Sequence, residues 1–153
     1  MSKPGPAAAD RVRAHDDVLG YLLKHGHLAL EQQTDAALAD MGLTARDLGV
    51  LRIIAGGEAR SQQEVAAVLG VDRTSMVALL DALESKGIVA RKPAEQDRRR
   101  NVIELTPDGR SLFQLAEQRS IKAEQAFTAA LGDTGGARLR RALRAVLDAG
   151  GQS

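Results

Sequence analysis

The most constraining feature of this chain is a closely spaced series of helix starts and stops near its middle. Ser61 and Glu64 have the Ser-x-x-Glu spacing of a capping box, and Gly70 is the kind of residue that ends a helix. Asp72 is then an N-cap for a second helix over 72–86. A helix of about eight residues followed at once by one of about fifteen predicts a helix-turn-helix.

A short hairpin is predicted directly after this motif. Residues 88–92 and 101–105 are short and β-branched enough to form strands, and the polar segment between them contains Pro93. A hairpin in this position makes the unit a winged helix-turn-helix, with the wing at 88–105. The fold class is therefore mainly α, with a small β component (α+β).

Long amphipathic helices are predicted on both sides of this lobe. The first pattern runs from Asp10 toward Asp40, with Gly26 as a weak point. Pro107 starts another long helix, and Asp133 or Thr134 can cap the last one.

The first and last helices lie at opposite ends of the sequence, and a winged lobe of this size cannot cover both apolar faces. Their apolar faces therefore need a partner, which predicts a homodimer. The expected organisation is a disordered tail at 1–9, dimerisation segments at 10–43 and 107–149, a winged helix-turn-helix lobe at 44–106 and a flexible tail at 150–153.

Composition excludes several classes of function. The chain has no Cys, which rules out disulfides, thiolate metal sites and cysteine redox sensing, and it has only two Phe, one Tyr and no Trp, which disfavours base-stacking platforms. His25 and His27 point to different sides of a helix, so no metal is expected. No catalytic set and no cofactor motif stand out. The chain lacks a signal peptide core and an apolar run of membrane-spanning length, so a cytoplasmic protein is predicted.

In a helix-turn-helix, the second helix enters the DNA major groove with its N-terminal residues facing the bases, so the base contacts are expected at the start of this helix. Arg73 can pair with guanine or phosphate, and Thr74 and Ser75 can do either. Val77 and Ala78 are small enough to touch a thymine methyl group. The alternative is that the polar residues here only cap the helix, but an Arg in a first helical turn opposes the helix dipole and needs another reason.

Positive charge is concentrated at the wing, although the net charge of the chain is only +1. The basic residues of this segment outnumber its acidic ones, Glu95 and Asp97; they are Arg91, Lys92, Arg98, Arg99 and Arg100. An arginine at a wing tip can enter the narrow minor groove of DNA, and its neighbours can hold phosphates. The alternative is a solvated turn without function.

The wing also carries a family resemblance. The stretch "DRRRNVIELTPDG" resembles the wing pattern of the multiple antibiotic resistance regulator (MarR) family, in which Asp-x-Arg is followed by Leu-Thr and then Gly. The matching positions are Asp97, Arg99, Leu105, Thr106 and Gly109. The stretches "GLTARDLGVLRII" and "SQQEVAAVLGVDRTSMVALLDALESKGIVAR" fit as well, so that the resemblance covers roughly residues 11–148.

This resemblance implies a dimeric regulator, expected to be a repressor, that binds a palindromic double-stranded operator with one half-site per subunit. Asp97 would hold the wing-tip arginine by a salt bridge, Arg99 would reach the minor groove, and Arg98 and Arg100 would meet phosphate. Many members of the family have a polar or basic residue where this chain has Val77 and Ala78, so an operator sequence does not transfer from them.

The resemblance further implies a small aromatic or anionic effector, bound in a crevice between the dimer helices and the lobe, that releases DNA. His15 and Tyr21 on the first helix are candidate effector contacts, and Arg52 could pair either with such an anion or with an internal carboxylate. The alternative function is a helical dimeric module that binds a ligand or a protein without binding DNA. The wing arginines beside Arg73 favour DNA.

Overall fold

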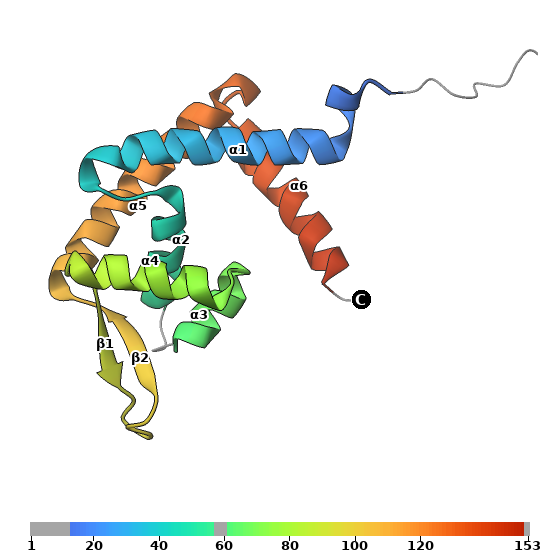
Figure 1. Cartoon of the computed structure of the whole chain (residues 1–153). Coiled ribbons are helices and arrows are strands. Elements are labelled where there is room, and N and C mark those ends of the chain that lie inside the picture. The colour runs from blue at the N-terminus through green and yellow to red at the C-terminus, as the bar shows by residue number, and fades with distance from the viewer. Residues whose placement is uncertain (1–12, 57–60, 152–153) are drawn as a thin grey trace, which may run out of the picture.

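The computed structural model describes residues 13–56 and 61–151, and within them it is mainly helical with one two-stranded antiparallel sheet (Figure 1). The elements in chain order are α1 (Leu19–Leu38), α2 (Ala45–Ala55), α3 (Gln62–Leu69), α4 (Arg73–Ser85), β1 (Val89–Pro93), β2 (Asn101–Leu105), α5 (Pro107–Thr128) and α6 (Gly135–Gly150). Short 3-10 turns occupy His15–Asp17, Ala39–Met41 and Ala129–Leu131. None of the helices in these residues is both long and apolar enough to cross a membrane.

The winged helix-turn-helix lobe forms around one core. Helices α2, α3 and α4 and the hairpin each contribute fully buried side chains, chiefly Leu48, Leu51, Val65, Met76, Leu80, Leu83 and Ile103. The hairpin pairs β1 with β2 in the register that runs from Val89 opposite Leu105 to Pro93 opposite Asn101. The first strand starts one residue later than predicted and includes Pro93, which is tolerated at the end of an edge strand.

The capping signals predicted at Ser61 and Gly70 form, and a further capping box starts α2. Thr44 with Asp47, and Ser61 with Glu64, make complete capping boxes at the starts of α2 and α3. Gly70 ends α3 in the left-handed conformation, with a φ of 65° that favours glycine.

The predicted outer helices require two corrections. The N-terminal helix is not continuous, because Val18 is extended with φ −81° and ψ 133°, and it separates a 3-10 turn from α1; Asp10 and the predicted tail 1–9 lie outside the described residues. Gly26 does not interrupt α1. Thr134 does occupy the N-cap position of α6, but its backbone is already helical and its side chain makes no capping hydrogen bond, so the predicted side-chain cap is wrong.

The long helices are tied together by polar contacts. Helix α1 lies across α5, and α6 leaves the end of α5 at an angle (Figure 1). The Arg119 guanidinium on α5 donates to the Asp40 carboxylate and, at 3.3 Å, to the Ala37 carbonyl. Arg140 on α6 pairs with Glu124 on α5. These contacts link the three helices within a single chain.

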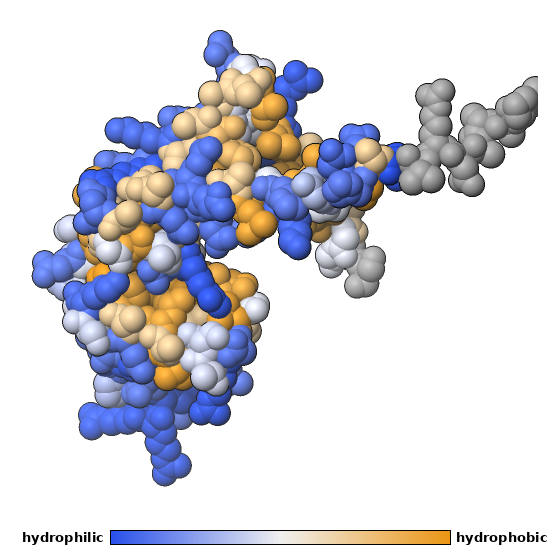
Figure 2. All heavy atoms as spheres, turned by 45° about the horizontal axis from the view of Figure 1, so that its top comes forward, coloured by the Kyte–Doolittle hydropathy of each residue, from blue (hydrophilic) through white to orange (hydrophobic). Residues whose placement is uncertain are grey.

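Apolar side chains remain at the surface of these helices (Figure 2). On α1, Leu19 is 65% exposed, and on α6, Val146 and Leu147 are 70% and 73% exposed. Helix α6 has no buried residue at all among those described, although its apolar residues line one face. Such a face is normally covered by a partner.

The lobe and α5 meet at one tight junction. The Thr106 hydroxyl donates to the Gly87 carbonyl at 2.5 Å and accepts from the Gly109 backbone N–H at 2.9 Å. The Thr106 backbone N–H donates to the Ile88 carbonyl at 3.0 Å. A Cβ atom placed on Gly109 would lie 1.9 Å from the Ile88 carbonyl oxygen, so only glycine fits at this position.

We therefore expect Gly109→Ala to lower the free energy of unfolding by roughly 1–3 kcal/mol or more, because the methyl group must displace the Ile88 backbone. Gly49→Ala is the matched control, since its Cβ would make an ordinary 3.5 Å contact with Leu69 inside a helix. There the change should be neutral or stabilising. Urea unfolding at one protein concentration measures the free energy of unfolding of both variants. Equal stability of the two would contradict the claim that only glycine fits at position 109.

Candidate nucleic-acid interface

The first turn of α4 presents its polar residues in two different ways. The Asp72 carboxylate caps the helix by accepting from the Ser75 backbone N–H at 2.8 Å, and it also accepts from the Ser75 hydroxyl at 2.7 Å. Capping is thus one role of Asp72, as the alternative interpretation held. Arg73 and Thr74 are exposed and make no side-chain bond to the described residues. They remain available to a ligand.

The side chains farther along α4 are small and face outward in part. Ala78 is exposed and Val77 is half-buried. One further turn along, Asp81 and Glu84 place two carboxylates on the same helix. The exposed surface of α4 therefore runs from a basic start to an acidic end.

The wing tip differs from the expectation for Asp97. Its carboxylate accepts from the Arg99 backbone N–H at 3.0 Å, and no ion pair joins it to an arginine within the described residues. The carboxylate has folded back onto the chain two residues later, which is the usual behaviour of Asp in a turn. Asp97 thus shapes the turn through the backbone, and the predicted salt bridge is absent in this structure.

The wing arginines are not equivalent. Arg100 lies 3.9 Å from the Glu64 carboxylate on α3, whereas Arg98 and Arg99 form no ion pair with a described residue. Lys92 pairs with Glu104 on the neighbouring strand at 2.9 Å. The free positive charge of the wing is therefore at its tip.

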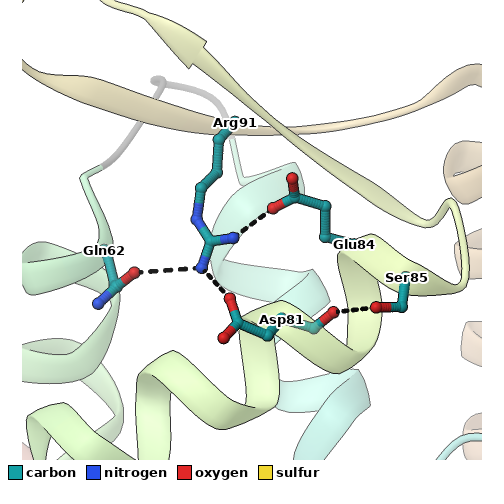
Figure 3. Close-up of polar contacts among 5 residues, drawn as sticks. All are labelled: Gln62, Asp81, Glu84, Ser85 and Arg91. Atoms are coloured by element: carbon teal, nitrogen blue, oxygen red, sulfur yellow. Dashed lines mark hydrogen bonds and ion pairs between the residues drawn. The ribbon is translucent and has the colours of Figure 1, made fainter.

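Arg91 is paired inside the lobe (Figure 3). Its guanidinium donates to Asp81 at 2.7 Å, to Glu84, and to the Gln62 side chain at 3.4 Å. Partial burial lowers the pKa of Arg91, but the hydrogen bonds and charges of the two carboxylates outweigh this effect and raise the pKa above its usual value. From the sequence, Arg91 was grouped with the free basic residues of the wing. No sequence pattern indicated that it pairs with Asp81, Glu84 and Gln62.

One groove connects the start of α4 with the wing. Its volume is about 710 Å³, and its walls are the start of α3, the start of α4 and strand β2. Arg73, Arg99 and Arg100 all line it, as does the paired Arg91. The structure therefore brings together candidate residues that lie in separate parts of the sequence, on one concave face.

The effector candidates are separated from one another. Arg52 donates to Glu117 at 2.5 Å and to the Ser120 hydroxyl at 2.9 Å, so the internal-carboxylate alternative is the one that the structure shows. His15 and Tyr21 instead make an edge-on ring contact, 5.5 Å between centroids, near the start of α1. Within residues 13–56 and 61–151, no cluster of three His, Asp or Glu side chains could hold a metal ion.

A second hollow of about 410 Å³ lies between α1, α2 and α5. Arg52 lines it, together with residues that were not predicted as effector contacts, including His27, Thr34 and Arg46. His15 and Tyr21 do not line it. The signal that could have found the α1 wall is the spacing of His27, Leu30, Glu31 and Thr34, which places them on one helix face.

The Asp72 cap predicts a pH dependence of stability. Hydrogen bonds from the Ser75 hydroxyl and backbone N–H lower the pKa of Asp72 below its usual 3.8. Its contribution is therefore complete above that value and is lost as the pH falls through the lower pKa of the folded state. Asp72→Asn keeps a capping acceptor that does not titrate. The stability advantage of the native chain over this variant should shrink as the pH falls below about 4, measured by urea unfolding; a pH-independent difference would count against it.

Comparison with known proteins agrees with this geometry. A model described as the MarR family matches residues 41–100. The chain is 34% identical over 116 residues to the putative transcriptional regulatory protein for the hcr operon of Thauera aromatica. This match covers 75% of this chain and 70% of that protein. It is 35% identical over 104 residues to the HTH-type transcriptional repressor Rv2887 of Mycobacterium tuberculosis, covering 68% and 75% of the two chains.

Solved structures show the same fold. The repressor CouR bound to a 23-mer DNA duplex superposes with a TM-score of 0.76 at 30% identity, covering 92% of this chain and 98% of that one. CouR from Rhodococcus jostii bound to p-coumaroyl-CoA gives a TM-score of 0.76 at 31% identity, covering 88% and 94%. Fold, motif and relatives agree, and the chain belongs to the MarR family of transcriptional regulators.

Proposed function

We propose that this protein is a homodimeric repressor in the cytoplasm that binds a palindromic double-stranded DNA operator. The observation that carries the proposal is the shared groove, in which exposed Arg73 and the wing arginines Arg99 and Arg100 face the same space. Helix α4 would enter the major groove while the wing reaches the adjacent minor groove. The relatives named as repressors, and the DNA complex of CouR, support this role.

The structure suggests different tasks for the residues of α4. Arg73 and Thr74 have unoccupied side chains and suit base or phosphate contacts. The Ser75 hydroxyl already donates to Asp72, so it is left with its acceptor capacity. Ala78, with Val77 partly behind it, offers methyl groups that suit a thymine.

At the wing, Arg99 is our candidate for the minor groove, and Arg98 and Arg100 are candidates for phosphate. The 3.9 Å pair between Arg100 and Glu64 joins two side chains that are 64% and 53% exposed. Such a pair contributes little to stability in water, so a DNA phosphate can replace Glu64 at small cost. The wing thus has its free charge where the duplex would lie.

The dimer is proposed from the uncovered apolar faces of α1 and α6. Leu139 and Leu143 of α6 line a hollow of about 530 Å³ together with Leu22, Leu23 and Phe127. A second copy would fill this hollow and cover the exposed residues of both helices. The resulting two-fold symmetry places one recognition helix on each half of a palindrome.

A small aromatic or anionic effector is proposed for the hollow between α1, α2 and α5. Arg46 and Arg52 lie there beside the carboxylates of Glu31 and Glu124, and CouR has been solved with p-coumaroyl-CoA. Arg52 also joins α2 of the lobe to Glu117 and Ser120 of α5. A ligand that takes Arg52 would break this link between the lobe and the dimerisation helix, which gives a route to DNA release.

DNA selected by the protein from its source genome tests the proposal. Arg73→Ala should weaken binding by about 1–3 kcal/mol and relax sequence preference. Arg99→Ala should weaken binding, and Arg98→Ala, which removes a phosphate contact, should lower the slope of log affinity against log salt by about one unit. Arg141→Ala is the matched control, because Arg141 is exposed on the face of α6 opposite its leucines. Failure to select any DNA would favour the alternative of a ligand- or protein-binding dimer.

The dimer has its own test. Light scattering should give about twice the 16.2 kDa of one chain. Leu143→Glu places a charge on the apolar face of α6, so the variant should shift toward monomer and lose affinity for the full palindrome. A native mass of one chain would overturn the dimer.

A further inference from the structure

Arg91 occupies the point where the wing leaves the core. Val89, two residues before Arg91, is buried, and so is Ile103, which pairs with Arg91 in the sheet. Lys92, directly after Arg91, is exposed. The side chain of Arg91 is only 25% exposed, and it reaches away from the sheet toward α3 and α4. It is therefore placed between the two parts of the lobe that would touch DNA.

The contacts of Arg91 use the geometry of a guanidinium. Nη1 donates to Glu84, while Nη2 donates to Asp81 at 2.7 Å and to the Gln62 amide oxygen at 3.4 Å. Figure 3 shows these three side chains converging on Arg91 from two helices. A lysine ammonium carries the same charge on a single nitrogen and cannot reproduce this fork.

Other polar ties of the wing are weaker or local. Lys92 pairs with Glu104 inside the hairpin, so it adds nothing between the wing and the helices. Arg100 approaches Glu64 of α3 only at 3.9 Å, with both side chains more than half exposed. Among the described residues, Arg91 is thus the side chain that joins the hairpin to the recognition helix by ion pairs.

Arg91 also neutralises negative charge on α4 that would oppose DNA binding. Asp81 follows Thr74 by seven residues and Ala78 by three, so all three lie on one side of the helix. An uncompensated carboxylate there would repel the phosphates that the proposed function brings close. The guanidinium compensates both Asp81 and Glu84 without occupying the exposed start of α4.

We propose that Arg91 is a positioning residue for DNA binding, which seats the wing against α3 and α4 and compensates the two carboxylates of the recognition helix. The proposal rests on the proposed function for its effect on affinity. Its geometric part, the seating of the wing, applies to the protein without DNA. The two parts can therefore be tested separately.

The DNA-free test measures the position of the wing directly. The chain has no native Cys, so Arg98→Cys at the wing tip and Ala82→Cys on α4 accept one spin label each. An excess of unlabelled protein suppresses distances between subunits. The label-to-label distance distribution should broaden in Arg91→Lys and in Asp81→Asn/Glu84→Gln, but not in Lys92→Gln, which removes a charge from the same strand without touching a helix contact. Equal widths in all four proteins would overturn the seating role.

The affinity test uses selected DNA. Arg91→Gln and Arg91→Lys should each weaken binding by about tenfold, and Lys92→Gln by clearly less, because charge alone does not restore the fork. Arg99→Ala should cost less in the Arg91→Lys background than in the native chain, since an unseated wing no longer delivers Arg99. Additive effects, or full rescue by Lys, would show that Arg91 acts as a simple charge.

Thermal unfolding of every variant separates positioning from loss of fold. The paired carboxylate variant keeps Arg91, so it tests the same contacts even if a change at Arg91 itself lowers stability. If the native protein selects no DNA, the proposed function fails while the spin-label result still decides the seating of the wing. If DNA is selected and the Arg91 variants bind it as the native protein does, the inference alone fails.

Discussion

The rest of the structure depends on the close approach between the Ile88 carbonyl and the start of α5. This carbonyl accepts the Thr106 backbone N–H at 3.0 Å, and it passes so near Gly109 that no side chain fits there. The contact joins Ile88, which lies between the end of α4 and the base of the hairpin, to the first turn of α5. A shift at this junction would move α4 and the wing relative to α5, because all three begin or end within a few residues of it.

Ion pairs determine which basic side chains of the lobe carry free charge. Arg91 and Lys92 are held by carboxylates of α4 and β2, whereas Arg73, Arg98 and Arg99 have no ion pair with a described residue. Unpaired positive charge thus lies on the groove and the wing tip, although the net charge of the chain is near zero. Local placement of charge, and not the total, determines what kind of partner the surface attracts.

Polar contacts away from this junction also connect the lobe to the helices outside it. Arg52 joins α2 to Glu117 and Ser120 on α5, and the Ala45 backbone N–H donates to Asp35 of α1 at 2.6 Å. Both α1 and α5 contribute to the hollow proposed for an effector. A ligand there would act on the same groups that hold the lobe in place, and this is how the proposed effector would be coupled to DNA binding.

The sequence alone determined the helix starts and stops of the lobe and its winged topology. Capping by Ser61, Asp72 and Thr106 operates within three or four residues, so it can be read without a structure. The tertiary structure decided which charges are free and which are paired. Arg91 finds Gln62 across 29 residues and Arg52 finds Glu117 across 65, and Asp97 turns to its own backbone instead of an arginine. Such partners depend on the angles at which packed elements meet, and no local pattern in the chain encodes those angles.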